Sequence, residues 1–321
     1  MTDHRQRIRQ WLARLRQTTD DALEYEVLQG GISGAYTYLV DPGTGPKVLK
    51  LTEAASSPVV LQRAQRELFF YRELASQVPI RVPQLLASYT DGTGTSVLLL
   101  VAYRPPEPPE RWQKAHYRQV AQQLASFHTC FWDTTEKLTA YPWLKRGSPG
   151  DLKRYLPQAH AAWQVLFEQP RFAETFTAHT RQMIAHLLPQ VQVLSERITA
   201  FPQTLCHGDC HMGNLLYDQQ GDPVWADWQE VGVGCGPEDL AFFLQRAQAA
   251  GGGAAYASMV EAYQEQLERL NTPVTLEAIR RVVAVSELCT RLVHWPGYLS
   301  QASPQQVADH LERIDLLAQD L

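Results

Sequence analysis

The sequence contains no long hydrophobic run. Its longest apolar stretch, residues 97–103, is far shorter than the roughly 20 residues that cross a bilayer. Residues 1–10 carry several charges and no apolar segment follows them, which disfavours a secretory signal. We therefore expect no membrane partner and a cytoplasmic location.

An excess of positive charge is also missing. The chain has 29 Lys and Arg against 34 Asp and Glu, a formal net charge of −5, so no basic field is available to hold nucleic acid. Its five cysteines are too few and too scattered for a disulfide framework, and we expect free thiols. What remains is a globular chain of 321 residues, 45% of them hydrophobic, which is enough for about two domains.

A proline-rich segment divides the chain. Arg104–Glu110 reads Arg-Pro-Pro-Glu-Pro-Pro-Glu, and neither a helix nor a central strand can pass through it. This predicts an N-terminal lobe over residues 1–103 and a C-terminal lobe over residues 104–321. The second part has 18 basic and 24 acidic residues, so the acidity of the chain belongs to it.

The N-terminal part alternates short extended stretches with glycine-rich turns. Apolar residues over 8–15 recur at helical spacing. Stretches 23–28, 36–40 and 48–51 predict an antiparallel meander, and residues 96–102 predict another strand. Between them, Ser57-Pro58 is typical of a helix start, and the helical pattern continues to Leu74.

The C-terminal part is predicted to be mostly helical. Residues 113–132 have an apolar face that includes Leu124 and Phe131, and His128 on that face is interpreted as a core histidine. Residues 204–228 break the helical period with short strands at 205–206, 215–217 and 224–226. The glycines at 232, 234 and 236 are interpreted as a turn before a helix that begins near Pro237.

Polar residues gather around the hairpin that these short strands predict. A turn over residues 219–222 would pair Leu216 with Trp225 and Asn214 with Asp227. An amide oxygen and a carboxylate placed in this way suit Mg²⁺, which takes few protein ligands and completes its shell with phosphates and water. Asp209 is near enough to face the same site and is free to accept a proton.

A second group of candidates lies in the N-terminal part. The loop 29–34 contains Gly30, Gly31, Ser33 and Gly34, so its backbone N–H groups can approach a phosphate closely. Lys50 lies in an apolar strand and needs an anionic partner, which Glu67 and a nucleotide phosphate could supply.

The residues by themselves are also compatible with purely structural roles. The glycine loop by itself indicates only a turn. Lys50 could reach solvent from an edge strand, and Glu67 could be an exposed helix residue paired with Arg63.

Four further residues of this region resemble zinc ligands at first sight: Cys206, His207, Cys210 and His211. A structural zinc site normally requires a second, separated ligand pair, and none follows. We expect His207 to hold the loop by packing and hydrogen bonding, and Cys210 and His211 to face the site in part.

The motifs occur in a recognisable order. His207-Gly-Asp-x-x-x-x-Asn214 is followed by Ala226-Asp227-Trp228 and then by Glu238-Asp239-Leu240-Ala241. This combination resembles the aminoglycoside phosphotransferase and choline kinase superfamily over about residues 28–244. The resemblance implies an α+β, bilobal protein-kinase-like fold, with an N-terminal antiparallel sheet lobe that binds nucleotide and a mostly helical C-terminal lobe that holds the catalytic loop and the acceptor pocket.

The resemblance also implies a role for each matching residue. Asp209 is the catalytic base or hydroxyl-positioning group, Asn214 and Asp227 bind Mg²⁺, Lys50 holds the nucleotide phosphates and Glu67 orients Lys50. Asp239 is expected to brace the catalytic loop. The adenine of the nucleotide is expected to contact mostly backbone near Val101 and Tyr103. The sequence lacks the acidic residue that the family often has there.

The expected activity is therefore Mg²⁺-dependent transfer of the γ-phosphate of ATP to a hydroxyl of a small molecule, with GTP not excluded. The slight acidity of the C-terminal part favours acceptors of the aminoglycoside, amino sugar or amino alcohol type. Two alternatives remain: a stress-response-type Ser/Thr protein kinase of the same superfamily, and a nucleotide-binding module without catalysis. Asp239 follows Asp227 so closely that no protein-kinase activation segment fits between them, which favours a small acceptor.

Overall fold

The chain folds into two compact units. A computed structural model describes residues 4–17, 23–28, 34–147, 149–252 and 256–319. The first unit comprises Met1–Pro108, Tyr141–Lys145 and His207–Val231, and the second comprises Pro109–Ala140, Arg146–Cys206 and Gly232–Leu321. The division into two units does not show which ligand either unit binds. The nucleotide-binding lobe over residues 1–103 and the acceptor lobe over residues 104–321 therefore stay predictions.

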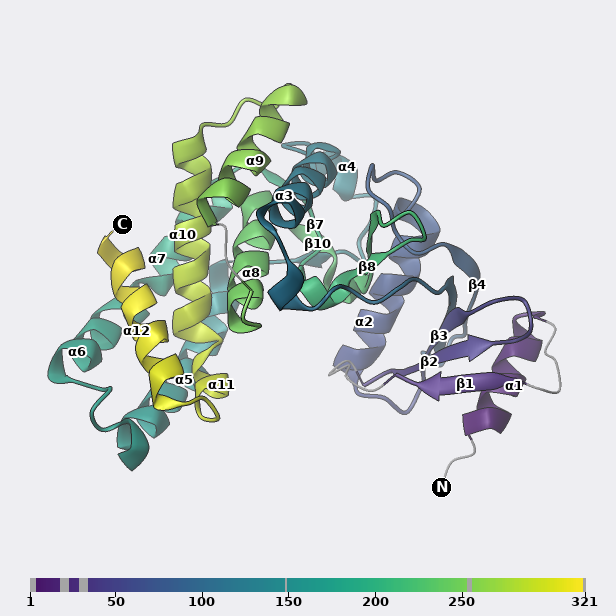
Figure 1. Cartoon of the computed structure of the whole chain (residues 1–321), viewed down its shortest axis with the longest axis horizontal. Coiled ribbons are helices and arrows are strands. Elements are labelled where there is room, and N and C mark those ends of the chain that lie inside the picture. The colour runs from purple at the N-terminus through teal and green to yellow at the C-terminus, as the bar shows by residue number, and fades with distance from the viewer. Residues whose placement is uncertain (1–3, 18–22, 29–33, 148, 253–255, 320–321) are drawn as a thin grey trace. The chain divides into compact units, whose positions relative to one another are not determined.

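A five-stranded antiparallel sheet forms the centre of the first unit (Figure 1). Its strands are β1 (Glu24–Val27), β2 (Tyr36–Asp41), β3 (Lys47–Thr52), β4 (Leu85–Thr90) and β5 (Ser96–Val101), in the order β1-β2-β3-β5-β4. The predicted meander and the strand near residues 96–102 are thus confirmed. The edge strand β4 was not predicted, and a register shift between Leu85 and Ala87 interrupts its pairing with β5.

The two faces of β3 have different neighbours. Side chains alternate along a strand, so Leu49 and Leu51 share one face, where they join Ile8 and Leu12 of helix α1 (His4–Arg14) in one buried cluster. Lys50 points to the opposite face. There the helix α2 (Pro58–Phe69) brings Glu67 close to it.

Helix α2 begins as predicted, with Ser57 at its N-cap and Pro58 in its first turn. It does not continue as a regular helix to Leu74. The backbone widens into a π-helical turn, η1 (Phe70–Leu74), at the point where Phe70 becomes fully buried. Such turns are often found at functional sites.

The first unit also contains a hairpin from much later in the chain. Its strands are β8 (Leu215–Tyr217) and β9 (Pro223–Trp225), preceded by the short 3-10 helix η5 (Met212–Asn214) and followed by η6 (Trp228–Glu230). Tyr217 exchanges backbone hydrogen bonds with Arg104, and the amide of Trp225 donates to the carbonyl of Arg81 at 2.8 Å. The hairpin is therefore joined to the N-terminal sheet region by backbone hydrogen bonds.

The predicted register of this hairpin is wrong by one residue. Trp225 pairs with Leu215 instead of Leu216, and the amide of Ala226, not Asp227, pairs with the carbonyl of Asn214. The reason is the loop length: Asp218 pairs with Asp222 and closes a three-residue loop, which ends on Gly221 at φ 88°. Asp227 consequently lies just beyond the paired residues, with a left-handed φ of 64°.

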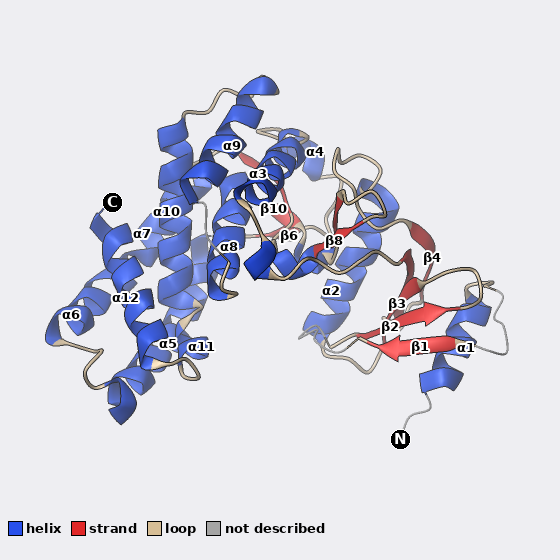
Figure 2. Cartoon of the chain, in the orientation of Figure 1, coloured by secondary structure: helices blue, strands red, loops and turns tan. Residues whose placement is uncertain are grey.

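The second unit is mostly helical, as predicted (Figure 2). Its longer helices are α3 (Lys114–Thr129), α5 (Pro149–Glu168), α6 (Ala178–Leu187), α7 (Val191–Thr199), α8 (Gly236–Ala249), α9 (Tyr256–Arg269), α10 (Leu276–Val293) and α12 (Pro304–Gln319). Shorter elements are η2 (Pro109–Arg111), α4 (Thr135–Leu138), η3 (Pro170–Phe172), η4 (Leu188–Gln190) and α11 (Pro296–Leu299), with the two-residue strand β6 (Lys145–Arg146) at the border between the units.

One antiparallel strand pair, β7 (Gln203–Cys206) with β10 (Gly232–Cys235), lies among these helices. The prediction of a turn over residues 232–236 is therefore wrong, because Gly232 and Gly234 pair with Cys206 and Thr204 in a ladder. Within the described residues, no helix is long and apolar enough to cross a membrane. All five cysteines are free thiols, as expected.

Polar groups are buried inside the second unit and satisfy one another. His128 of α3 is fully buried, as predicted; its Nδ1 lies 2.8 Å from the hydroxyl of Tyr263 and its Nε2 lies 3.2 Å from Oδ2 of Asp239. A second group ties α10 to α12. There Glu287 accepts hydrogen bonds from Arg291 and Arg313, while Arg291 also contacts His310.

His310 makes the stability of this unit depend on pH. Burial, and then the charge of Arg291, lowers the pKa of His310 to about 3, whereas a histidine in an unfolded chain titrates near 6.5. Between these values the unfolded chain binds the proton more readily, so stability that is present above about pH 6.5 is lost as the pH falls toward 3.

We expect His310 alone to lower the free energy of unfolding by about 2 kcal/mol between pH 7 and pH 5. Urea denaturation of the wild type and of His310→Gln, which cannot titrate, would measure this. The variant should have the shallower pH dependence. An identical slope for both proteins would contradict the assignment.

Candidate active site

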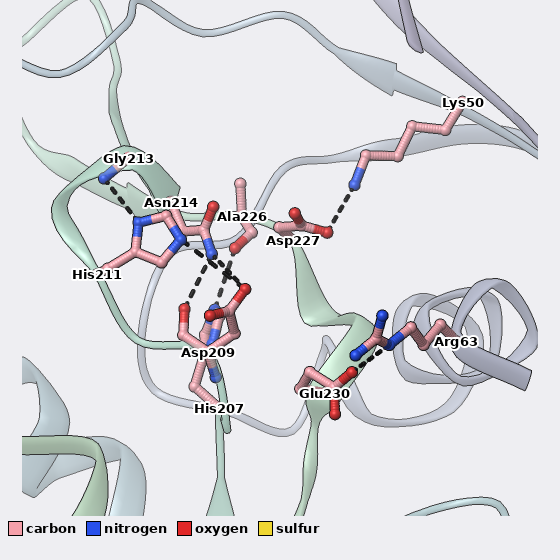
Figure 3. Close-up of polar contacts among 10 residues, drawn as sticks. All are labelled: Lys50, Arg63, His207, Asp209, His211, Gly213, Asn214, Ala226, Asp227 and Glu230. Atoms are coloured by element: carbon pink, nitrogen blue, oxygen red, sulfur yellow. Dashed lines mark hydrogen bonds and ion pairs between the residues drawn. The ribbon is translucent and has the colours of Figure 1, made fainter. Parts of the chain in front are cut away.

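Lys50, Glu67 and Asp227 form one charged group in the first unit. The Nζ atom of Lys50 lies 2.8 Å from Oε1 of Glu67 and 3.0 Å from Oδ1 of Asp227 (Figure 3 shows the second contact). Residues from strand β3, helix α2 and the end of β9 thus meet at one ammonium group. The predicted pairing of Lys50 with Glu67 is confirmed, and the alternative of an exposed Glu67 paired with Arg63 is wrong.

Burial and charge act against each other on these three groups. Burial by itself would lower the pKa of Lys50, but the carboxylates of Asp227 and Glu67 outweigh it and raise this pKa above its usual value. Burial raises the pKa of Glu67, and Lys50 offsets that only in part. Burial also acts to raise the pKa of Asp227, but the attraction of Lys50 prevails and lowers it. Lys50 is therefore a permanent cation, and Asp227 is an anion at neutral pH.

The loop from His207 to Asn214 is fixed from within. His207 is buried, its Nδ1 accepts the amide of Asp209 at 3.3 Å, and its Nε2 lies 3.0 Å from the carbonyl of Ala226. This confirms that His207 holds the loop. Cys210, which was expected to face the site in part, is instead fully buried.

Gly208 allows the loop to pass close to the segment after Asp227. Its φ is 79°, and a Cβ atom at this position would lie 2.3 Å from the carbonyl oxygen of Glu230. Only glycine fits such a position without moving the backbone. The middle residue of the His-Gly-Asp motif therefore has a steric explanation.

Asp209 and Asn214 come together in this loop. The Nδ2 of Asn214 donates to the carbonyl of Asp209 at 2.9 Å and lies 3.4 Å from its Oδ2. Oδ1 of Asp209 has no hydrogen bond to any residue that the structure describes. One oxygen of Asp209 is therefore held, and the side chain as a whole is 37% exposed.

The oxygens nearby suit a hard divalent cation. Because the nitrogen of Asn214 points to Asp209, its oxygen faces the other way, as Figure 3 shows. Asp227 shares Oδ1 with Lys50, while its Oδ2 makes no hydrogen bond within the described part of the chain. One amide oxygen and one carboxylate oxygen fit the few protein ligands that Mg²⁺ takes.

The predicted phosphate loop can be described only at its end. Gly30, Gly31 and Ser33 lie outside the described residues. Gly34 has a φ of 72°, and a Cβ atom there would lie 2.9 Å from Cγ2 of Val60 in α2. This position therefore requires glycine for both its conformation and its space.

Val101 and Tyr103 lie at the end of β5, beside a hollow of about 720 Å³. The amides of Val101, Ala102 and Arg104 donate to backbone carbonyls of the chain. Among the described residues, no partner is found for the amide of Tyr103.

Sequence reasoning missed how α2 is attached to the segment after Asp227. The side chains of α2 and the start of η1 at positions 63, 66, 67 and 70 share one helix face and contact residues 228–230 in succession. Phe70 stacks on Trp228 with ring centroids 3.9 Å apart. Glu67 accepts the amide of Trp228 in addition to Lys50. In the sequence these four positions are three, one and three residues apart, and this helical spacing could have indicated that they share one face.

Glu230 completes this attachment with charge. It accepts a hydrogen bond from Arg63 and one from Lys145 at 2.6 Å, and Arg66, which is buried and donates to the carbonyl of Gln229, lies 3.9 Å away. Burial acts to raise the pKa of Glu230, but Lys145 first and then Arg63 lower it. Two of these cations, Arg63 and Arg66, bind α2 to the segment that carries Asp227, and Lys145 joins the same carboxylate from outside the helix.

Asp239 contacts His128 within the second unit. With Cys206, these residues are the group in the described part of the chain whose ligand atoms lie close enough to hold a metal. Both ring nitrogens of His128 and Oδ2 of Asp239 already have polar partners, Nδ1 with the hydroxyl of Tyr263 and Nε2 with Asp239. The bracing of the catalytic loop by Asp239 stays a prediction.

The comparison with known proteins identifies the family. The profile of the phosphotransferase enzyme family matches residues 24–273, and the chain belongs to this family. The resemblance inferred from the motifs, and the prediction of an enzyme that transfers phosphoryl groups, are confirmed. A search among curated protein sequences finds no match.

Solved structures with the same fold share little sequence with the chain. The GDP complex of wild-type aminoglycoside 2'-phosphotransferase-IIIa has 15% identity and a TM-score of 0.64, with 100% of both chains covered. A microcompartment-associated aminopropanol kinase has 16% identity and a TM-score of 0.59, covering 98% of this chain and 94% of that one. Macrolide 2'-phosphotransferase from Brachybacterium faecium has 17% identity and a TM-score of 0.60, covering 95% and 97%. The predicted α+β fold class is confirmed.

The charges around Glu230 give a first test of the site. In Glu230→Ala the buried Arg66 loses its carboxylate, and we expect the free energy of unfolding to fall by about 2–3 kcal/mol. Glu53→Ala is the matched control, because the side chain of Glu53, which pairs with Arg7, is 42% exposed, and its loss should cost less than about 1 kcal/mol. Urea denaturation measures both. Equal losses would contradict a structural role for Glu230.

Proposed function

We propose that the chain uses Mg²⁺ and ATP to transfer the γ-phosphate to a hydroxyl of a small molecule of the aminoglycoside, amino sugar or amino alcohol type. The observation that supports this most is the state of Asp209. Its Oδ2 is held by the loop while Oδ1 is open, in the same unit as the Lys50, Glu67 and Asp227 group. A carboxylate of this kind can orient a hydroxyl and accept its proton.

Each residue then has a defined task. Lys50, kept in place by Glu67, binds the phosphates of the nucleotide, together with the backbone amides of the loop from Gly30 to Gly34. Backbone groups of Val101 and Tyr103 hold the adenine of the nucleotide. Asn214 and Asp227 hold Mg²⁺, which when bound neutralises phosphate charge as the phosphoryl group is transferred. Asp209 directs the acceptor hydroxyl along the line of displacement.

Support for the nucleotide and the acceptor comes from proteins of the same fold and from the charge of the chain. ATP is our first choice, although one relative of the same fold was solved with GDP. The relatives named for aminoglycoside, macrolide and aminopropanol substrates all act on small molecules that carry hydroxyls. The surplus of acid in residues 104–321 favours an acceptor with an amine.

The structure offers little support for a protein acceptor. Only η6 and β10 separate Asp227 from helix α8, which begins at Gly236. A protein kinase needs a longer segment there to bind its substrate peptide. The binding-module alternative predicts nucleotide binding without turnover, which the following experiment separates.

Turnover should depend on Asp209. Thermal-shift titrations with Mg²⁺-ATP, Mg²⁺-GTP and each component alone, followed by ADP release across a panel of aminoglycosides, amino alcohols and hydroxylated metabolites, would identify the nucleotide and acceptor class. Asp209→Asn should then lower kcat at least about 100-fold and leave the nucleotide-dependent shift intact. Asp222→Asn, next to the loop of the same hairpin, is the control and should be fully active. Undiminished turnover in Asp209→Asn would refute the assignment.

Nucleotide binding should depend on Lys50 and not on its neighbour Lys47. Lys47 lies on the same strand but faces the other way, where it donates to Thr44 and Gly45 in the adjoining turn. We expect Lys50→Met to weaken Mg²⁺-ATP binding at least about 30-fold by calorimetry, and Lys47→Met to change it little. Similar losses of Mg²⁺-ATP binding in both variants would mean that the two lysines affect binding only through the stability of the fold.

A further inference from the structure

His211 is a polar residue of the catalytic loop to which neither the motif nor the proposed function gives a task. It is the N-cap of η5, with its Nδ1 accepting the amide of Gly213 at 3.1 Å. Its backbone carbonyl accepts the amide of Asn214 at 3.0 Å. The ring is thus held at one end by the loop itself.

The other end of the ring faces the proposed catalytic carboxylate. Nε2 of His211 lies 3.8 Å from Oδ2 of Asp209, and Figure 3 shows the ring between Gly213 and Asp209. This is longer than a direct hydrogen bond, but catalytic contacts are often long without substrate and tighten when it binds. Oδ2 is the same oxygen that Asn214 approaches at 3.4 Å.

The hydrogen bond at Nδ1 decides which nitrogen carries the proton. Because Nδ1 accepts the amide of Gly213, it has no hydrogen of its own, and in a neutral ring the proton is on Nε2. Nε2 therefore presents a donor to Asp209. A nitrogen that already carries a proton cannot accept one, so His211 is not itself the base.

Gly213 gives the ring the space that this arrangement needs. A Cβ atom at position 213 would lie 3.0 Å from Cε1 and 3.1 Å from Nδ1 of His211. A larger residue there would require the ring to shift by a few tenths of an ångström. The sequence His-x-Gly-Asn thus fixes the ring from the backbone side.

We propose that His211 is a positioning residue that acts through Asp209, a role that rests on the proposed function. Together with Asn214 it holds Oδ2, so that Oδ1 is the oxygen that meets the acceptor. In the transfer, the acceptor O–H bond breaks and its proton goes to Oδ1. The hydroxyl oxygen forms a bond to the γ-phosphorus while the bond from that phosphorus to the β–γ bridging oxygen breaks. The nucleoside diphosphate leaves with that electron pair, and Asp209 later returns the proton to water.

Two substitutions separate the two contacts of the ring. His211→Asn keeps an acceptor near Nδ1 and remains a good N-cap, but it has no donor that reaches Asp209. His211→Gln places an N–H near the position of Nε2 and loses the cap. We expect kcat to fall about 10- to 100-fold in His211→Asn and to stay within about threefold of the wild type in His211→Gln, with KM for the nucleotide little changed in both.

A purely structural role for His211 predicts the reverse order. In that case His211→Asn, which keeps the cap, would be the more active variant and His211→Gln the less active one, and this result would overturn the proposal. Gly213→Ala gives a further check, because it leaves His211 in the chain but moves its ring. It should lower kcat in the same way as His211→Asn.

A spectroscopic measurement tests the geometry without turnover. Long-range ¹H–¹⁵N spectra at a pH where histidines are neutral, about 8.5, with His211 assigned by comparison with His211→Gln, should show the Nε2–H tautomer. They should also show a changed Nε2 shift in Asp209→Ala. The Nδ1–H tautomer would overturn the proposal whatever the activity.

These experiments distinguish an error in the role of His211 from an error in the proposed function. If the wild type turns over and His211→Asn matches it, only the role of His211 is refuted. If the wild type binds nucleotide but phosphorylates no acceptor, the proposed function is refuted, and the role of His211 with it.

Discussion

The site depends on one buried cation. Lys50 extends from the central strand β3 to the face of the sheet opposite α1, and a charge in that place requires anions around it. It has two, Glu67 and Asp227, one from the following helix and one from a hairpin 177 residues further along the chain. Without either carboxylate, the ammonium would be left without full compensation. The need to balance this charge thus brings three distant segments together.

The contacts of α2 follow from the same constraint. Because Glu67 is directed at Lys50, neighbouring side chains on the same face of α2 meet the residues after Asp227. Phe70 stacks on Trp228, Arg66 donates to the carbonyl of Gln229, and Arg63 pairs with Glu230. Ion pairs on a surface contribute little, but Arg66 and Glu230 are largely buried. These contacts fix one face of α2 to the residues that follow Asp227.

The sequence allowed the sheet, the helical C-terminal part and the family to be predicted, because each rests on local spacing or an ordered motif. Lys50 and Glu67 could be paired because a charge in an apolar strand demands a partner. The register of β8 and β9 could not be predicted, since it depends on whether the loop has three or four residues. Strand β4 lacks a regular apolar alternation, and β10 is half glycine, so neither shows a strand pattern. The contacts of Glu230 and His211 depend on backbone conformation, including the left-handed residues 208 and 227.

The composition of the first unit has a consequence for synthesis on the ribosome. Its sheet and α2 are complete by Pro108, but the segment that ends at Val231 belongs to the same unit. At about 5–20 residues per second, the earlier part waits roughly 6 to 25 s for the later one. During that interval Lys50 has only Glu67, and Arg66 has neither the carbonyl of Gln229 nor the carboxylate of Glu230. The emerging N-terminal part is thus unfinished until more than two thirds of the chain has been made, and it is in this period that a chaperone would have most to bind.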